Sequence, residues 1–163
     1  MKKKITRQKK GFLLILPLLL IAAVSGYSGF LLPQSTGDEA NGIWLTGSKE
    51  SMIEISKTGN TYVGKLFWLK IPNDPATGKP KLDTKNPEPK LRSRPILGLT
   101  LMQDFKFDAS SKEWSGGTIY DPKSGSTYHC KASLPEKNTL KVRGYIGASW
   151  MGLGRTESWS RIK

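Results

Sequence analysis

The chain has 163 residues, with 26 Lys and Arg against 13 Asp and Glu, and a formal net charge of +13. One cysteine, Cys130, excludes an intramolecular disulfide, and one histidine, His129, excludes a histidine-rich metal site. Six basic residues lie within the first ten positions and the other 20 are scattered. That scatter argues against a nucleic-acid-binding protein.

The first 32 residues have the pattern of an export segment. A basic cluster without acids precedes an apolar run at 12–32, and the secretion machinery reads this order of charge and hydrophobicity. We predict that residues 1–32 are a signal peptide or an N-terminal membrane anchor and that the protein is exported to the periplasm or cell envelope. Cleavage near Val24-Ser-Gly26 competes with retention of 11–32, because about 20 residues suffice to span a bilayer.

A polar stretch at 33–41 is predicted to be a linker, and 42–163 a single domain large enough for its own core. Alternating apolar and β-branched residues predict strands almost throughout this domain. The expected strands are 42–46, 51–56, 61–69, 99–107, 113–120, 126–134, 139–146 and 155–162. Short turns join most of them, so we predict an all-β fold: an antiparallel up-and-down β-barrel of about eight strands, with room for packed side chains or one small ligand.

Residues 70–95 interrupt this strand pattern. The stretch holds six prolines, which exclude both a helix and a central strand. It is longer than an ordinary loop, so we expect a flap that is either functional or packed on the domain.

The two ends of the domain are expected to meet. In an up-and-down barrel the first and last strands pair, which brings Trp44 close to Arg161. A guanidinium stacked on an indole would seal one end of the barrel by a cation–π contact. A Gly-x-Trp start with an arginine on the closing strand is also the pattern of lipocalin-like proteins.

A longer series of motifs resembles the bacterial domain-of-unknown-function family 2147 over 42–163. The resemblance implies one compact, exported, lipocalin-like barrel and carries no reaction with it. The motifs are Gly42-Ile-Trp44, Gly64-Lys-Leu-Phe-Trp68, Asp83-Thr-Lys-Asn86-Pro87, Leu91-Arg92-Ser-Arg94-Pro-Ile-Leu-Gly98, Trp114-Ser-Gly-Gly-Thr-Ile-Tyr120-Asp121-Pro122, Gly125-Ser-Thr-Tyr128, Leu140-Lys-Val-Arg143-Gly144-Tyr145 and Trp159-Ser-Arg161.

Aromatic residues and glycines on the expected strands suit the wall of a cavity for an apolar ligand, although they equally suit a filled core. The residues that we predict to face the interior and bind a ligand are Tyr62, Trp68, Trp114, Tyr120, Tyr128 and Arg143. Arg143 fits this set least well, because strand alternation places its side chain on the other face of the strand from Leu140 and Val142.

A second candidate site lies on the flap. Arg92 and Arg94 are two residues apart and, in an extended chain, point the same way, as in a site for a carboxylate, phosphate or sulfate. The alternative is that they pin the flap to an acid. The residues concerned are Asp83, Asn86, Arg92, Arg94 and Asp121.

The remaining reactive residues predict no chemistry. His129 and Cys130 are neighbours on one strand and face opposite sides, with Cys130 inward, so they do not share a metal. No Gly-x-Ser-x-Gly motif accompanies the histidine. We expect no catalytic residue, metal or cofactor, and no nucleic-acid partner.

The sequence therefore favours an envelope protein, not an enzyme, that binds a small hydrophobic or amphipathic ligand in its barrel. Contact with a membrane is expected only through the N-terminal segment, if it is not cleaved. Two alternatives stay open. One is an enzyme acting on envelope material through the 70–95 flap, and the other is a structural or interaction module with a filled barrel.

Overall fold

A computed structural model describes residues 35–148 and 151–163. The predicted export segment lies outside the described residues. Within the described part, no helix is both long and apolar enough to cross a bilayer.

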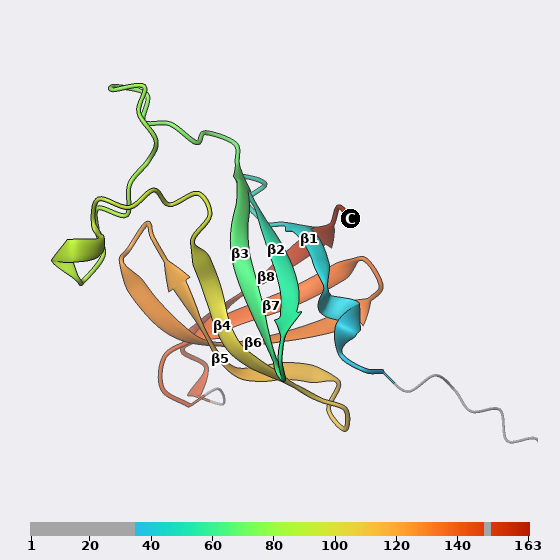
Figure 1. Cartoon of the computed structure of the whole chain (residues 1–163). Helices are drawn as coiled ribbons and strands as arrows, with labels where there is room; N and C mark the ends of the chain where they lie inside the picture. Colours follow the sequence, from blue (N-terminus) through green and yellow to red (C-terminus); the bar gives the residue numbers. More distant parts are fainter. Residues whose placement is uncertain (1–34, 149–150) are drawn as a thin grey trace, which may run out of the picture. The chain divides into compact units, whose positions relative to one another are not determined.

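Eight antiparallel strands close into a barrel, in which each strand pairs with its neighbours in the sequence and the first pairs with the last (Figure 1). This confirms the predicted fold class. The strands are β1 (Gly42–Leu45), β2 (Ser51–Thr58), β3 (Thr61–Leu69), β4 (Thr100–Asp108), β5 (Glu113–Asp121), β6 (Ser126–Glu136), β7 (Thr139–Tyr145) and β8 (Gly154–Arg161).

The strand ends differ from the predicted ones by one or two residues for local reasons. β2 runs on to Thr58 because the hairpin needs only Gly59 and Asn60, with Gly59 at a φ of 60°. The 70–95 stretch contains no strand of the barrel, as its prolines require. It holds one short 3₁₀ helix, η2 (Pro89–Leu91), and isolated bridges from Asn73 to Pro80 and from Leu82 to Pro95.

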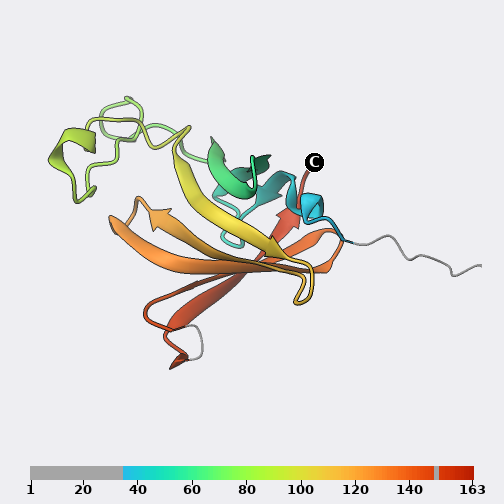
Figure 2. The same cartoon turned by 60° about the horizontal axis from the view of Figure 1, so that its bottom comes forward.

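Connections alternate between the two ends of the barrel. The β1–β2, β3–β4, β5–β6 and β7–β8 connections lie at one end, which we call the open end. The β3–β4 connection, residues 70–99, extends from this end (Figures 1 and 2). It contains the predicted 70–95 flap, and from here on we call the whole connection the flap. The opposite, closed end carries the three remaining hairpins and the chain leading into β1.

Arg161 seals the closed end. Its guanidinium carbon lies 4.1 Å from the centre of the Trp44 ring, and the two residues are partners in the β1–β8 ladder. The same guanidinium donates hydrogen bonds to the backbone carbonyls of Glu39, Asn41 and Lys137. The predicted contact between the first and last strands is therefore present, and Arg161 also holds the chain leading into β1 and the β6–β7 turn.

Residues 37–41, the second half of the predicted linker, pack into the closed end. They include a 3₁₀ helix, η1 (Asp38–Ala40), whose Ala40 is only 2% exposed. Trp44 Nε1 donates to the Ala40 carbonyl at 2.8 Å, and Trp114 Nε1 donates to the Gly37 carbonyl at 3.1 Å. Buried indole N–H groups need acceptors, and this short polar stretch supplies them.

Replacement of Arg161 by Ala should lower the free energy of unfolding by about 2–3 kcal/mol, because it removes a cation–π contact and hydrogen bonds from a charged donor. Arg161→Lys, which keeps the charge but loses the planar fork, should recover only part of this loss. Denaturant melts of the three proteins test the expectation, and an unchanged midpoint for Arg161→Ala would contradict it.

A chain that starts at Asn41 should be less stable than one that starts at Ser35, by at least about 2 kcal/mol. The shorter chain leaves the indole N–H groups of Trp44 and Trp114 without their acceptors. Thermal melts of the two chains provide the comparison. Identical melts would show that 35–40 contributes nothing to the barrel.

Candidate ligand-binding cavity

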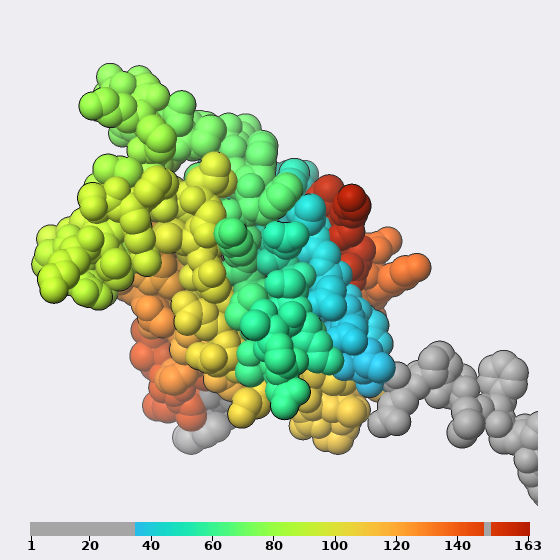
Figure 3. Space-filling model, viewed as in Figure 1, coloured from blue at the N-terminus to red at the C-terminus, as the bar shows by residue number. Residues whose placement is uncertain are grey.

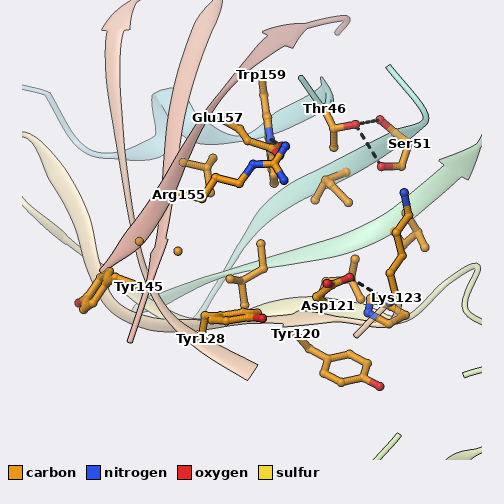
Figure 4. Close-up of a pocket in the computed structure, with 18 of the residues that line it drawn as sticks. Thr46, Ser51, Tyr120, Asp121, Lys123, Tyr128, Tyr145, Arg155, Glu157 and Trp159 are labelled. Carbon is orange, nitrogen blue, oxygen red and sulfur yellow. Dashed lines mark hydrogen bonds and ion pairs between the residues drawn. The ribbon is translucent and has the colours of Figure 1, made fainter. Parts of the chain in front are cut away.

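The open half of the barrel encloses a cavity of about 600 Å³ (Figure 4). Inward-facing aliphatic side chains from most of the strands form its wall. They include Ile53, Leu66, Leu101, Ile119 and Val142. A void of about 10 Å³ among Tyr62, Phe105 and Trp114 lies in the closed half, where large side chains fill the interior, so the barrel is packed at one end and hollow at the other.

Two glycines show why one half of the barrel is packed and the other is hollow. A Cβ on Gly64 would lie 2.9 Å from Met102 atoms, so this glycine permits close packing in the closed half. Gly144 lines the cavity, and a Cβ there would meet only Ile119 and Tyr128, both at 3.7 Å. The missing side chain at position 144 therefore leaves space that an ordinary residue would occupy.

A charged pair on β8 lies at the cavity wall near the opening, with Arg155 largely exposed to solvent. Arg155 Nη2 lies 2.9 Å from Glu157 Oε1, and Trp159 Nε1 donates to Glu157 Oε2 at 3.4 Å. Figure 4 shows the three side chains together on one side of the cavity. On the β1–β2 hairpin, Thr46 Oγ1 lies 3.2 Å from Ser51 Oγ. The wall is thus mainly apolar, with a few polar groups toward the opening.

The predicted ligand-binding residues separate into three groups. Tyr128 pairs with Ile119 and faces the cavity. Tyr120 borders the cavity but faces outward, which corrects the prediction: the bulge between Trp114 and Gly117 reverses the alternation, and the Tyr120 ring points away from Arg155 and Glu157 (Figure 4). Tyr62 and Trp114 face the interior but lie in the packed closed half, where their rings meet edge to face.

Trp68 and Arg143 do not face the interior, which corrects the prediction. A bulge between Met52 and Ile53 shifts the β2–β3 register, so Trp68 pairs with Met52 and is exposed. Arg143 lies on the outer face of β7, where it donates to Thr156 Oγ1.

The residues that sequence reasoning missed lie on β8. Strand alternation places Arg155, Glu157, Trp159 and Arg161 on one face. Since the expected Arg161–Trp44 contact already fixed that face as inward, the same parity indicated Glu157 and Arg155 as cavity residues. Arg and Glu on a strand usually face solvent, so the residue types alone did not mark these two positions as cavity residues.

The flap is held to β5 by a buried carboxylate. Asp83 is fully buried, and Tyr120 donates its hydroxyl to Asp83 Oδ1 at 2.5 Å. Asn86 Nδ2 donates to Asp83 Oδ2 at 2.8 Å, and Arg94 donates to the same oxygen through Nε at 3.0 Å and Nη2 at 2.9 Å. We call these four side chains the flap latch. Arg94 thus pins the flap to Asp83, as one of the two interpretations of the arginines expected.

Arg92 and Asp121 are not members of the flap latch. Arg92 Nε donates to the backbone carbonyl of Asn86 at 2.8 Å. Asp121 accepts from Lys123 N and Ser124 Oγ, which places it as the cap of its own turn. None of the flap candidates except Asp121 lines the cavity.

Burial by itself raises the pKa of the Asp83 carboxyl, but hydrogen bonds from Tyr120, Asn86 and Arg94, with the Arg94 charge, outweigh it and hold the pKa below its ordinary value. Burial and the neighbouring Asp83 raise the pKa of Tyr120. The flap latch therefore has a charged carboxylate and a protonated phenol at neutral pH.

His129 and Cys130 face opposite sides of β6, as alternation predicted. His129 is exposed and stacks on Tyr145, with ring centres 5.7 Å apart. Cys130 is fully buried, and burial raises the pKa of its thiol to about 12.

Asp83→Asn should free the flap while leaving the barrel folded. The change removes a charged acceptor that three donors share, so the free energy of opening the flap should fall by about 2 kcal/mol. Faster hydrogen exchange of the backbone amides of residue 83 and Ile96 measures this loss. In the unchanged protein, the folded-state pKa of Asp83 lies below the unfolded one. The flap latch should therefore persist above about pH 4 and weaken as the pH falls further.

Asp104, an exposed residue on β4, provides the matched control: Asp104→Asn should leave the hydrogen-exchange rates of the flap amides unchanged. Equal exchange in the two variants would show that Asp83 does not hold the flap.

Cys130 should resist alkylation at pH 8 in the folded protein and react fully in denaturant, because the reactive thiolate is scarce and buried. Mass spectrometry after maleimide treatment measures this difference. Rapid modification of the folded chain would contradict the burial.

Comparison with solved structures gives a match to protein HP1028 from Helicobacter pylori, which is described as belonging to the lipocalin family. The match has a TM-score of 0.62 and 24% sequence identity, and it covers 76% of this chain and 82% of the other. At this identity it supports the fold alone.

No curated protein matches the sequence. A family model described as "Uncharacterized protein conserved in bacteria (DUF2147)" matches residues 42–161, which is nearly the entire barrel. The family suggested by the sequence motifs is therefore the right one, and the chain belongs to the DUF2147 family.

Proposed function

We propose that this barrel binds one small hydrophobic or amphipathic molecule in its open half. The observation that carries the proposal is the cavity of about 600 Å³, since sites for small ligands are commonly 300–1,000 Å³ and mainly apolar. The alternative of a filled barrel does not account for an interior of this size.

The polar groups of the cavity support an amphipathic ligand held in one orientation. Aliphatic residues such as Leu66 and Val142 form the inner wall, whereas Arg155 and Lys123 lie toward solvent. An apolar body would enter first and bury its surface, and a polar end would stay near the opening. The basic and apolar N-terminal pattern supports placing this binding outside the cytoplasm.

Titration with an apolar fluorescent probe should give saturable binding, with a change in tryptophan emission because Trp159 lines the cavity. Gly144→Phe should weaken binding at least about tenfold by filling the cavity, a loss of about 1.4 kcal/mol or more. Gly144→Ala is the matched control. Its Cβ meets neighbours only at ordinary contact distance, so it should bind nearly as well as the unchanged protein.

Two results would contradict the proposal. One is the absence of saturation with any apolar probe in a folded protein. The other is equal affinity of the Phe and Ala variants, because a ligand bound elsewhere would not sense the volume at position 144.

A further inference from the structure

Exposed hydrophobic side chains gather at the open end of the barrel. The described part of the chain exposes nine large hydrophobic side chains, and eight belong to the end of β3, the flap or the β7–β8 connection. Only Ile162 lies at the closed end. We call the eight the apolar collar: Phe67, Trp68, Ile71, Leu82, Leu97, Ile146, Met151 and Leu153.

Part of the apolar collar borders the mouth of the cavity. Ile146 and Leu153 also line the cavity itself, and the flap contributes Ile96 to the same wall. Figures 1 and 2 show the flap and the β7–β8 connection on different sides of the open end, and Figure 3 shows the flap protruding from the surface. Exposed apolar side chains gathered in one region of a surface mark a site of interaction.

The flap, which carries part of the apolar collar, is positively charged. Residues 70–99 contain seven Lys and Arg and three Asp and Glu, a net charge of +4. One of the acids, Asp83, is buried and neutralised by Arg94. At the closed end, by contrast, residues 35–41, the hairpins at 57–60, 108–113 and 136–139 and the C-terminal residues 161–163 together carry five bases and five acids, with no net charge. The open end is therefore both the apolar and the basic end of the barrel.

We propose that the open end docks on the surface of a bilayer containing anionic lipids. Apolar side chains on an otherwise polar surface, flanked by lysines, bind the interface by burying apolar area and by attraction to anionic head groups. A bilayer fits better than a compact protein partner, because a flat surface reaches collar residues on separate connections at once. Docking in this way opens the cavity toward the acyl chains.

This docking is independent of whether the cavity holds a ligand, so the two proposals fail separately. The experiment uses the full chain, in which Cys130 is fully buried and should not react with a thiol dye; the unchanged chain treated with the dye is the control. Three single variants receive an environment-sensitive dye: Ile71→Cys and Ile146→Cys in the apolar collar, and Ile162→Cys at the closed end. The three isoleucines are matched in exposure, at 53%, 62% and 52%.

With vesicles of phosphatidylglycerol and phosphatidylcholine, the dyes at positions 71 and 146 should shift to shorter wavelength, and the dye at 162 should not. Vesicles of phosphatidylcholine alone, or 1 M salt, should reduce the shift at position 71. Equal shifts at all three positions, or no shift at 71 and 146, would overturn the proposal, since attachment through any other part of the chain leaves the apolar collar in water.

The charge contribution is tested in the dye-labelled Ile71→Cys chain. Lys79→Gln with Lys90→Gln removes two flap charges, and the lipid concentration needed for half the shift should rise at least about fivefold. Lys137→Gln with Lys141→Gln, exposed lysines outside the open end, is the control and should leave it unchanged. Equal behaviour of the two double variants would overturn the electrostatic part of the proposal.

Discussion

The stacking of Arg161 on Trp44 is the interaction on which the barrel depends. The Arg161 guanidinium on β8 covers the Trp44 ring on β1. It also donates hydrogen bonds to backbone carbonyls of Glu39 and Asn41, which lead into β1, and of the β6–β7 turn. A meander of antiparallel strands leaves two exposed edges unless its first and last strands pair. Here the β1–β8 ladder has two residue pairs, and backbone hydrogen bonds between Ile43 and residues 162 and 163 extend it. The side-chain contact therefore reinforces the shortest part of the ladder.

Closure at one end explains the asymmetry of the interior. Large aromatic side chains and the 37–41 segment fill the closed half, where Gly64 allows strands to approach Met102 closely. The open half has aliphatic walls, Gly144 and a charged pair near the solvent. The packed closed half contributes the buried core of the barrel. The open half can therefore leave apolar surface uncovered, which is what a binding cavity needs.

The flap shows how a long connection stays ordered without strands. Its anchor is the Asp83 carboxylate, whose burial is compensated by donors from Tyr120, Asn86 and Arg94. Sequence reasoning brought Asp83, Asn86 and Arg94 together as candidates for chemistry. In the structure they satisfy one another, so their close spacing reflects the folding of the flap, and the outer surface of the flap is left to lysines and apolar side chains.

The sequence by itself determined the strands, their order and the barrel closure, because alternation, turn residues and prolines are local signals and a meander pairs neighbours in sequence. It also indicated the family and the inward face of Cys130. Only the tertiary structure decided where the interior is hollow, that 37–41 belongs to the core and that Trp68 faces outward. These depend on a register shift, on the volumes of side chains from several strands and on hydrogen bonds between residues far apart in the chain, which no local pattern records.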